Sequence, residues 1–233
     1  FIALSAFEAQ ESFHATTFEH LKKVGVVFPI LGSAEYFKEF DRFRNSISSS
    51  YGDKKLGATM AKAEEFLKSN RPNIDRYSNH LTHTDFVPHN FRLSKNEVFV
   101  IDCVPNHATV HFGNKYEGWA RFLSYMMLHN PELEKLLSEY IRKNRGENEY
   151  LSLRLMRVYK LGFLLDYYAR SISKTEGDLR ILTELRLDFW NEALKAVLED
   201  SVLSPSVISE YKQKRDQLRS AEEKERQREF AVV

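Results

Sequence analysis

Apolar residues recur at three- and four-residue steps along much of this chain, which is the spacing of helices that bury one face. The clearest stripe follows Ser33, a favourable helix N-cap, and contains Tyr36, Phe37, Phe40, Phe43 and Ile47. The same spacing predicts further helices over residues 5–23, 57–67, 116–130, 132–143, 148–173, 177–199 and 205–228. Proline and glycine separate the later ones, so most of the chain is predicted to be helical.

Residues 77 to 102 follow a different pattern, in which short apolar runs alternate with turn residues. Three short strands are predicted there: His80–Thr82, Phe91–Leu93 and Val98–Ile101. Ser94–Glu97 is the predicted turn between the last two, and the polar stretch from Pro105 to Lys115 is expected to lead into the next helix. The predicted fold class is therefore α+β, mostly α, with a short β-hairpin.

Composition narrows the classes of function. With 42% hydrophobic and 29% charged residues, the chain is expected to be globular with a polar surface. Its 34 basic and 33 acidic residues leave a net charge of +1, which provides no overall field for attracting nucleic acid or an anionic membrane. The longest apolar stretch, residues 24–31, is far shorter than the ~20 residues that cross a bilayer. The single cysteine, Cys103, cannot form an internal disulfide, and a cytoplasmic location is expected.

A dense polar cluster, His83 to Asn90, precedes the predicted hairpin, and Asp102 follows its last strand. Phosphoryl transfer needs a carboxylate that orients the attacking hydroxyl, and oxygen ligands for the magnesium ion that bridges the nucleotide phosphates. Asp85 suits the first task. Asn90 and Asp102 suit the second, because Mg²⁺ prefers oxygen donors and needs few of them from the protein. A hairpin over residues 91–101 returns the chain, so Asn90 and Asp102 are expected to lie side by side.

The pattern His-x-Asp-x-x-x-x-Asn over residues 83–90, followed by a hydrophobic strand that ends in Ile101-Asp102, resembles a kinase family. It is similar to the catalytic and metal-binding segments of aminoglycoside phosphotransferases and of choline and ethanolamine kinases. Many members also carry proline two positions before the asparagine, as Pro88 does here. The resemblance implies a role for each residue: catalytic base for Asp85, magnesium ligands for Asn90 and Asp102, and loop support for His83 and Pro88.

The resemblance also implies an architecture and a reaction. Residues 1–204 would form a protein-kinase-like C-terminal lobe, and residues 205–233 a charged helix and tail packed on the lobe or trailing from it. The implied reaction moves the γ-phosphate of ATP, or GTP, to a hydroxyl of a small molecule such as an aminoglycoside or a choline-like metabolite. Mg²⁺ assists the transfer.

The family's β-rich N-terminal lobe, with its phosphate-pairing lysine and adenine-holding hinge, has no counterpart in this sequence. A missing N-terminal lobe is therefore expected, supplied in cis or in trans. One alternative is a catalytically inactive kinase-like domain that binds or scaffolds without that lobe. Another is a helical partner-binding protein in which the motif is coincidental.

Several residues depart from the family pattern or have simpler readings. Thr84 and His89 stand where many relatives have glycine, and Cys103 where they have tryptophan; these positions shape the loop more than they perform chemistry. Cys103 is expected to pack as a small buried hydrophobe. Glu117 either substitutes for an aspartate that supports the catalytic loop in relatives or faces solvent. Five histidines lie close together in the sequence and could form a zinc site: His80, His83, His89, His107 and His111. The favoured interpretation is that they are scattered polar residues.

Overall fold

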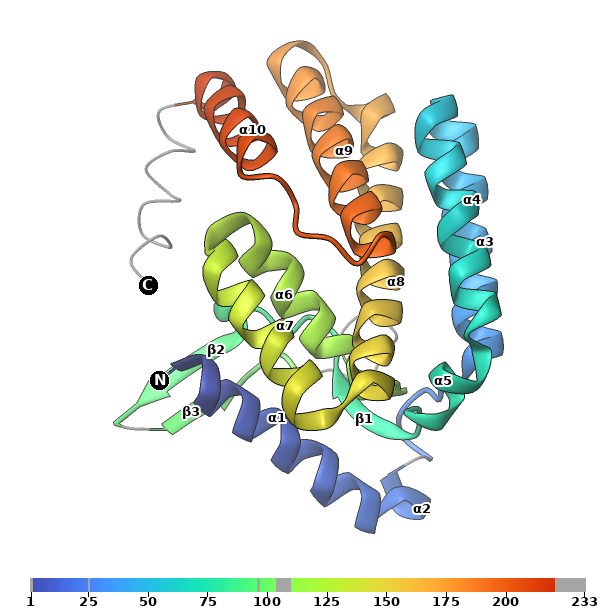
Figure 1. Cartoon of the computed structure of the whole chain (residues 1–233), viewed down its shortest axis with the longest axis vertical. Coiled ribbons are helices and arrows are strands. Elements are labelled where there is room, and N and C mark those ends of the chain that lie inside the picture. The colour runs from blue at the N-terminus through green and yellow to red at the C-terminus, as the bar shows by residue number, and fades with distance from the viewer. Residues whose placement is uncertain (1, 25, 96, 104–109, 221–233) are drawn as a thin grey trace. The chain divides into compact units, whose positions relative to one another are not determined.

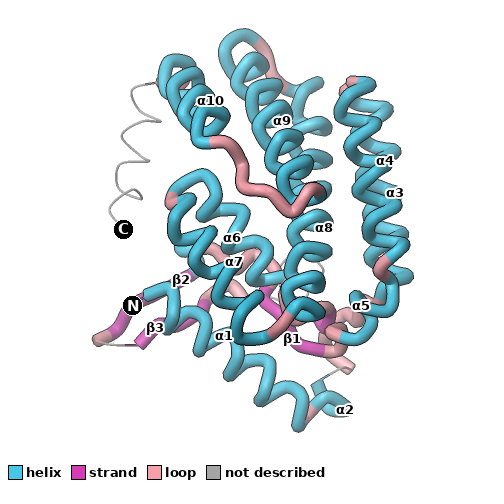
Figure 2. The backbone as a smooth tube through the Cα atoms, viewed as in Figure 1, coloured by secondary structure: helices cyan, strands magenta, loops and turns pink. Residues whose placement is uncertain are grey.

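The computed structural model describes residues 2–24, 26–95, 97–103 and 110–220, and most of them are helical (Figure 2). In chain order the elements are α1 (Ile2–Glu19), α2 (Leu21–Val24), α3 (Ser33–Ser50), α4 (Lys54–Ser69), α5 (Arg71–Arg76), β1 (His80–His83), η1 (Pro88–Asn90), β2 (Phe91–Ser94), β3 (Glu97–Val100), β4 (Val110–Gly113), α6 (Glu117–His129), α7 (Pro131–Arg145), α8 (Glu147–Ser171), η2 (Ile172–Lys174), α9 (Gly177–Leu198) and α10 (Pro205–Leu218) (Figure 1). The fold class is α+β, mostly α, which confirms the class predicted from the pattern.

The chain forms two compact units. The first contains residues 1–38 and 66–160, and the second contains residues 39–65 and 161–233. The boundaries fall inside α3, α4 and α8. All the named strands and every residue of the predicted site belong to the first unit.

Two small antiparallel sheets organise the first unit. β1 pairs with β4 so that Leu81 faces Phe112, and β2 pairs with β3 so that Phe91 faces Val100. The segment before α3 joins the first sheet, where the Leu31 amide donates to the carbonyl oxygen of Phe112 at 2.7 Å. α1 contacts β1 and β3, and its Phe13 packs against the cluster of Leu81, Val110 and Phe112 (Figure 1). This cluster anchors the sheet that leads into the site.

The second unit is a helical assembly with an aromatic core. Phe43 of α3 and Phe163 of α8 meet edge to face, with ring centroids 5.9 Å apart. α8 approaches α3 closely because Gly162 of α8 has no side chain; a Cβ there would lie 2.4 Å from the Phe40 ring of α3. α10 packs on α9, where the rings of Phe189 and Tyr211 stack 4.4 Å apart. The last helix is therefore attached through apolar contacts, although most of its surface is polar.

Several element boundaries differ from the prediction for local reasons. α4 begins at Lys54 rather than Gly57, because the Asp53 carboxylate accepts a hydrogen bond from the Leu56 amide at 2.6 Å and caps the helix. Pro72 stands in the first turn of a further short helix, α5, where its missing N–H costs nothing. The helix predicted over 5–23 is divided into α1 and α2. α10 ends at Leu218, and residues 221–228 of the prediction lie outside the described residues.

Among the strands of the described residues, β4 is the one that the sequence pattern missed. Residues 105–115 were expected to be a polar connection, yet Val110–Gly113 pairs with β1 along its whole length. All four residues of β4 are buried, so the strand lacks the alternation of polar and apolar positions that marks a half-exposed strand. Residues 104–109 lie outside the described part of the chain.

Within the described residues, no helix has both the length and the apolar character needed to cross a membrane.

Candidate functional site

The loop between β1 and η1 places Asp85 and Asn90 in direct contact. The Asn90 side-chain amide donates from Nδ2 to the Asp85 carbonyl oxygen at 2.8 Å and to its carboxylate oxygen Oδ2 at 3.2 Å. Pro88 begins η1 with its φ angle preset, and the Asn90 backbone amide donates to the carbonyl oxygen of Val87 at 2.9 Å. Because Nδ2 donates to Asp85, Oδ1 is the atom of the Asn90 side chain that remains as a possible ligand oxygen.

The β2–β3 hairpin brings the far end of the motif back to Asn90. The Ile101 amide donates to the Asn90 carbonyl oxygen at 2.9 Å, which extends the pairing of Phe91 with Val100 by one residue. Asp102 is the next residue in the chain. The hairpin thus returns the chain to Asn90 at Ile101, and the placing of the Asp102 carboxylate beside the Asn90 side chain stays a prediction.

His83, the last residue of β1, also contacts the end of the hairpin, at Ile101. Its Nε2 lies 2.9 Å from the Ile101 carbonyl oxygen and must donate to it, since a carbonyl can only accept. Burial lowers the pKa of His83 and outweighs the opposing effects of the Ile101 carbonyl and of the Asp85 and Asp102 carboxylates. A neutral, buried imidazole thus braces the segment that precedes Asp102.

Asp102 adopts an unusual backbone conformation. Its φ angle is +64°, in the left-handed region that non-glycine residues seldom enter. Asp and Asn tolerate this region better than other side chains, but it still costs energy, and such strain is common where a side chain must be aimed at a site. The residue is exposed, so its carboxylate is open to solvent.

Arg121 of α6 adds a partner for Asp85 that the sequence analysis did not identify. Its Nε donates to Asp85 Oδ1 at 3.0 Å, and the Asp85 side chain is still 39% exposed. A carboxylate has roughly four lone-pair positions, so Arg121 and Asn90 together leave Asp85 able to accept another hydrogen bond. No local motif marks Arg121, because it comes from a helix far along the chain.

α6 lies close to the site loop, and an aromatic cluster fills the space between them. Phe86, which is completely buried, contacts the rings of Phe91, Trp119 and Phe122. Gly118 allows the helix backbone to approach β1, because a Cβ there would lie 2.6 Å from the His83 carbonyl oxygen. The position of Arg121 therefore depends on packing around Phe86 and on the absence of a side chain at Gly118.

Gly118→Ala is expected to lower the free energy of unfolding by about 1–3 kcal/mol, the usual cost of overpacking. The clash is with a backbone oxygen, which cannot rotate away as a side chain does, so α6 must shift away from β1. Urea denaturation of the two purified proteins measures the difference. Gly57→Ala is the control: it lies in α4, its Cβ would meet nothing within 4 Å, and helix propensity favours alanine by ~1 kcal/mol. Equal destabilisation by both substitutions would contradict the close approach.

Glu117, at the start of α6, lies at the centre of a buried polar network. It is 1% exposed, and its Oε2 accepts hydrogen bonds from the Tyr36 hydroxyl and from His111 Nε2, both at 2.7 Å. Lys160 Nζ donates to Oε1 at 3.1 Å. Burial by itself would raise the pKa of Glu117, but His111 and Lys160 outweigh it and lower this pKa to about 2. The solvent-facing reading of Glu117 is wrong, because its charge is matched inside the core.

Cys103 also differs from its expected environment. Cys103 was expected in the core, whereas it is exposed and follows Asp102 directly in the chain. Partial desolvation and the Asp102 carboxylate raise the pKa of the thiol, so no thiolate is favoured at neutral pH.

The histidines of the described residues are not gathered around a common point where zinc could bind. Within the described residues, no group of three or more His, Cys, Asp or Glu side chains is placed to hold a metal ion. His83 and His111 are instead committed to Ile101 and Glu117, and His107 lies outside the described residues. Mg²⁺ keeps several waters and needs only one or two protein oxygens. The amide oxygen of Asn90 and the carboxylate of Asp102 are oxygen donors of the type that could hold it.

Comparison with known proteins adds no relative to this description, since no family model, curated protein or solved structure matches the chain.

Proposed function

We propose that this chain is the phosphate-transfer lobe of a small-molecule kinase, resembling the aminoglycoside phosphotransferase and choline kinase group. It would transfer the γ-phosphate of ATP or GTP to a hydroxyl of a small polar molecule, with Mg²⁺, in the cytosol. The observation that carries the proposal is that Asn90 is joined to Asp85 through its side-chain amide and to Ile101, the residue before Asp102, through its carbonyl oxygen. The nucleotide-gripping lobe would be supplied in cis or in trans.

Each side chain has a task that follows from its contacts. Asp85 orients the attacking hydroxyl and accepts its proton, while Asn90 and Arg121 hold the carboxylate in place. Asn90 Oδ1 and the Asp102 carboxylate would hold Mg²⁺, which when bound neutralises charge on the phosphates. His83 and Pro88 fix the loop so that these oxygens stay together. Acceptor choice would rest on side chains around Asp85.

The test is a screen of hydroxyl acceptors, among them aminoglycosides and amino alcohols, with Mg²⁺ and labelled ATP or GTP. Transfer of label to an acceptor supports the proposal, and the same screen with the nucleotide-binding lobe added identifies a requirement for it. Failure to bind magnesium–nucleotide by calorimetry, with and without the added lobe, would overturn it.

Asp102→Asn is expected to weaken magnesium–nucleotide binding about tenfold or more, which corresponds to ~1.4 kcal/mol or more. The amide keeps the size of the side chain and tolerates positive φ, but it loses the charge that holds the cation. Titration calorimetry with each nucleotide measures the effect. Asp200→Asn is a matched control, because Asp200 is also exposed and has a φ angle of +52°. Equal affinity in both variants would remove Asp102 from the site.

The Arg121–Asp85 ion pair favours a second candidate, a kinase-like domain that binds or scaffolds without catalysis. In that case the guanidinium would serve to neutralise a carboxylate that no longer accepts a proton. Calorimetric titration separates the two candidates. A kinase lobe binds magnesium–nucleotide, whereas a scaffold does not, and the stability of a scaffold does not change when Mg²⁺ or nucleotide is added.

A further inference from the structure

α6 has one open face, and that face begins at the Asp85 loop. Ten of the thirteen residues of α6, all of which the structure describes, are buried. The three that are not, Arg121, Tyr125 and His129, follow one another at four-residue steps and are called the α6 stripe below. Residues at this spacing lie along one face of a helix. Because Arg121 contacts Asp85, the α6 stripe extends directly from the proposed base.

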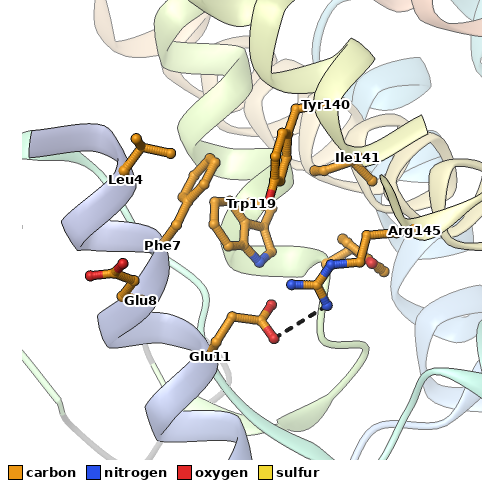
Figure 3. A pocket seen from close by; sticks show the side chains of 9 residues that line it. Leu4, Phe7, Glu8, Glu11, Trp119, Tyr140, Ile141 and Arg145 are labelled. Carbon is orange, nitrogen blue, oxygen red and sulfur yellow. Dashed lines mark hydrogen bonds and ion pairs between the residues drawn. The ribbon is translucent and has the colours of Figure 1, made fainter. Parts of the chain in front are cut away.

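Another face of α6 is packed against α1 and α7. Trp119 lies two residues before Arg121, about 200° away around the helix axis. It lines a small pocket together with residues of α1 and α7, among them Tyr140 (Figure 3). This pocket is therefore separate from the α6 stripe, and Tyr140 provides a reference tyrosine away from it.

Arg121 keeps most of its hydrogen-bonding capacity. Its Nε donates to Asp85 Oδ1 at 3.0 Å, and this is the one hydrogen bond that it makes within the described residues. Its side chain is 24% exposed, so the terminal nitrogens Nη1 and Nη2 are open to a ligand beside the proposed base. Two parallel N–H groups of a guanidinium match the two oxygens of a carboxylate.

Tyr125 adds a second donor one turn further along α6. Its ring stacks on His129 with centroids 4.2 Å apart and meets His89 of the site loop edge to face at 5.7 Å. These contacts hold the ring in place, while its hydroxyl makes no hydrogen bond within the described residues and is not fully buried. Burial raises the pKa of Tyr125 and outweighs the opposing effect of Arg121, so the hydroxyl keeps its proton and can donate.

The charges around these donors favour a single carboxylate as their ligand. The Arg121–Asp85 pair is neutral overall, and Asp102 adds a negative charge to the same motif. A group with two negative charges is therefore repelled more than a group with one. An ammonium group fits no better, because the α6 stripe contains a guanidinium and no carboxylate.

From these features we propose that the acceptor is a hydroxy acid, whose carboxylate binds Arg121 and Tyr125 while its hydroxyl reaches Asp85. This inference rests on the proposed phosphate transfer. The hydroxyl proton passes to Asp85 as the hydroxyl oxygen bonds to the γ-phosphorus, and the bond from that phosphorus to the β–γ bridging oxygen breaks, which releases the nucleoside diphosphate. Since Arg121 touches Asp85, few carbon atoms separate the carboxylate and the hydroxyl of the acceptor.

Two sets of matched compounds test the acceptor class. Glycerate, glycerol and 3-aminopropane-1,2-diol share three carbon atoms, and gluconate, sorbitol and glucamine share six. Each compound is titrated into the ¹⁵N-labelled full chain and its affinity is measured by NMR. The acid is expected to bind about tenfold or more tightly than the matched alcohol or amine, because it gains charge-assisted hydrogen bonds. Glycerol 3-phosphate is expected to bind more weakly than glycerate, because it is a dianion.

Two variants assign the preference to the α6 stripe. Arg121→Gln should bind the favoured acid about ten- to a hundredfold more weakly, because it removes the charged donors. Tyr125→Phe keeps the ring and its stacking, removes only the hydroxyl, and should bind the acid about three- to tenfold more weakly. Neither change should affect binding of the matched alcohol. Tyr140→Phe, the matched control, should bind the acid as the unaltered chain does.

The assignment fails if no acid binds, if the alcohol or amine binds as tightly as the acid in both sets, or if Arg121→Gln keeps full affinity for the acid. Tighter binding of glycerol 3-phosphate than of glycerate would replace the carboxylate by a phosphate. The same compounds are then incubated with Mg²⁺ and labelled nucleotide. If an acid binds at Arg121 but receives no label, phosphate transfer fails and the binding site stands. If only neutral acceptors are labelled, phosphate transfer stands and the hydroxy acid is wrong. Titration of the unaltered chain decides these points even if a variant does not fold.

Discussion

Asp85→Asn is expected to transfer phosphate about 10²- to 10⁴-fold more slowly than the unaltered chain, the usual contribution of a general base. The amide can still accept a hydrogen bond from Arg121, so the loop keeps its contacts, but it cannot take the proton of the attacking hydroxyl. The loss should appear in kcat with little change in the KM for nucleotide. Steady-state assays with the best acceptor from the screen measure both constants.

Two further variants separate catalysis from loop structure. Asp178→Asn, at an exposed position in the first turn of α9, should leave kcat unchanged. Arg121→Gln should reduce kcat less than Asp85→Asn does, because it removes an orienting contact and keeps the base. Full turnover by Asp85→Asn would show that the carboxylate is not the base. A greater loss in Arg121→Gln would mean that the guanidinium contributes more than orientation.

Glu117→Ala is expected to lower the free energy of unfolding by about 3–5 kcal/mol, because it leaves Lys160 buried without its counter-charge. Lys160 is 6% exposed and cannot reach water without disturbing α8. The hydroxyl of Tyr36 and the ring of His111 also lose their acceptor. Equilibrium urea unfolding gives the value, and Glu132→Ala, at an exposed position of α7, should change it little.

The pH dependence of stability gives a second measure of the same residue. The pKa of Glu117 in the folded protein, about 2, lies below the ordinary glutamate value of 4.5, so its contribution to stability is present above pH 4.5 and is lost as the pH falls toward 2. Glu117→Gln should lack this part of the acid sensitivity. Replacing Lys160 by methionine in the Glu117→Leu background should recover much of the loss, since an apolar pair needs no counter-charge. An unchanged stability of Glu117→Ala would contradict a network of this strength.

Much of the helical framework was predictable because its signals are local. The stripe from Tyr36 to Ile47 specifies a helix that buries one face, and the structure has α3 over Ser33–Ser50. The proximity of Asn90 and Asp102 was predictable for a similar reason. A hairpin is a short-range structure, and its pairing register determines which residues flank its ends.

Contacts between distant segments were decided by tertiary packing. β4 is a strand because it pairs with β1 and because Val110 and Phe112 pack against Leu81 in one apolar cluster. Neither contact can be read from residues 110–113 alone. The ion pair of Glu117 with Lys160 also joins distant segments. From the sequence alone, a single glutamate is equally consistent with a buried, paired position and with a solvent-exposed one. The same holds for the exposure of Cys103 beside the hairpin.

The place of Asp85, five residues before Asn90, can be read directly from the sequence, and so can the hairpin that follows. The contact of Arg121 with the Asp85 carboxylate could not be read from it. Pairing within a hairpin is set by residues close together in the chain, whereas the approach of α6 depends on tertiary packing, through the burial of Phe86 and the space left by Gly118.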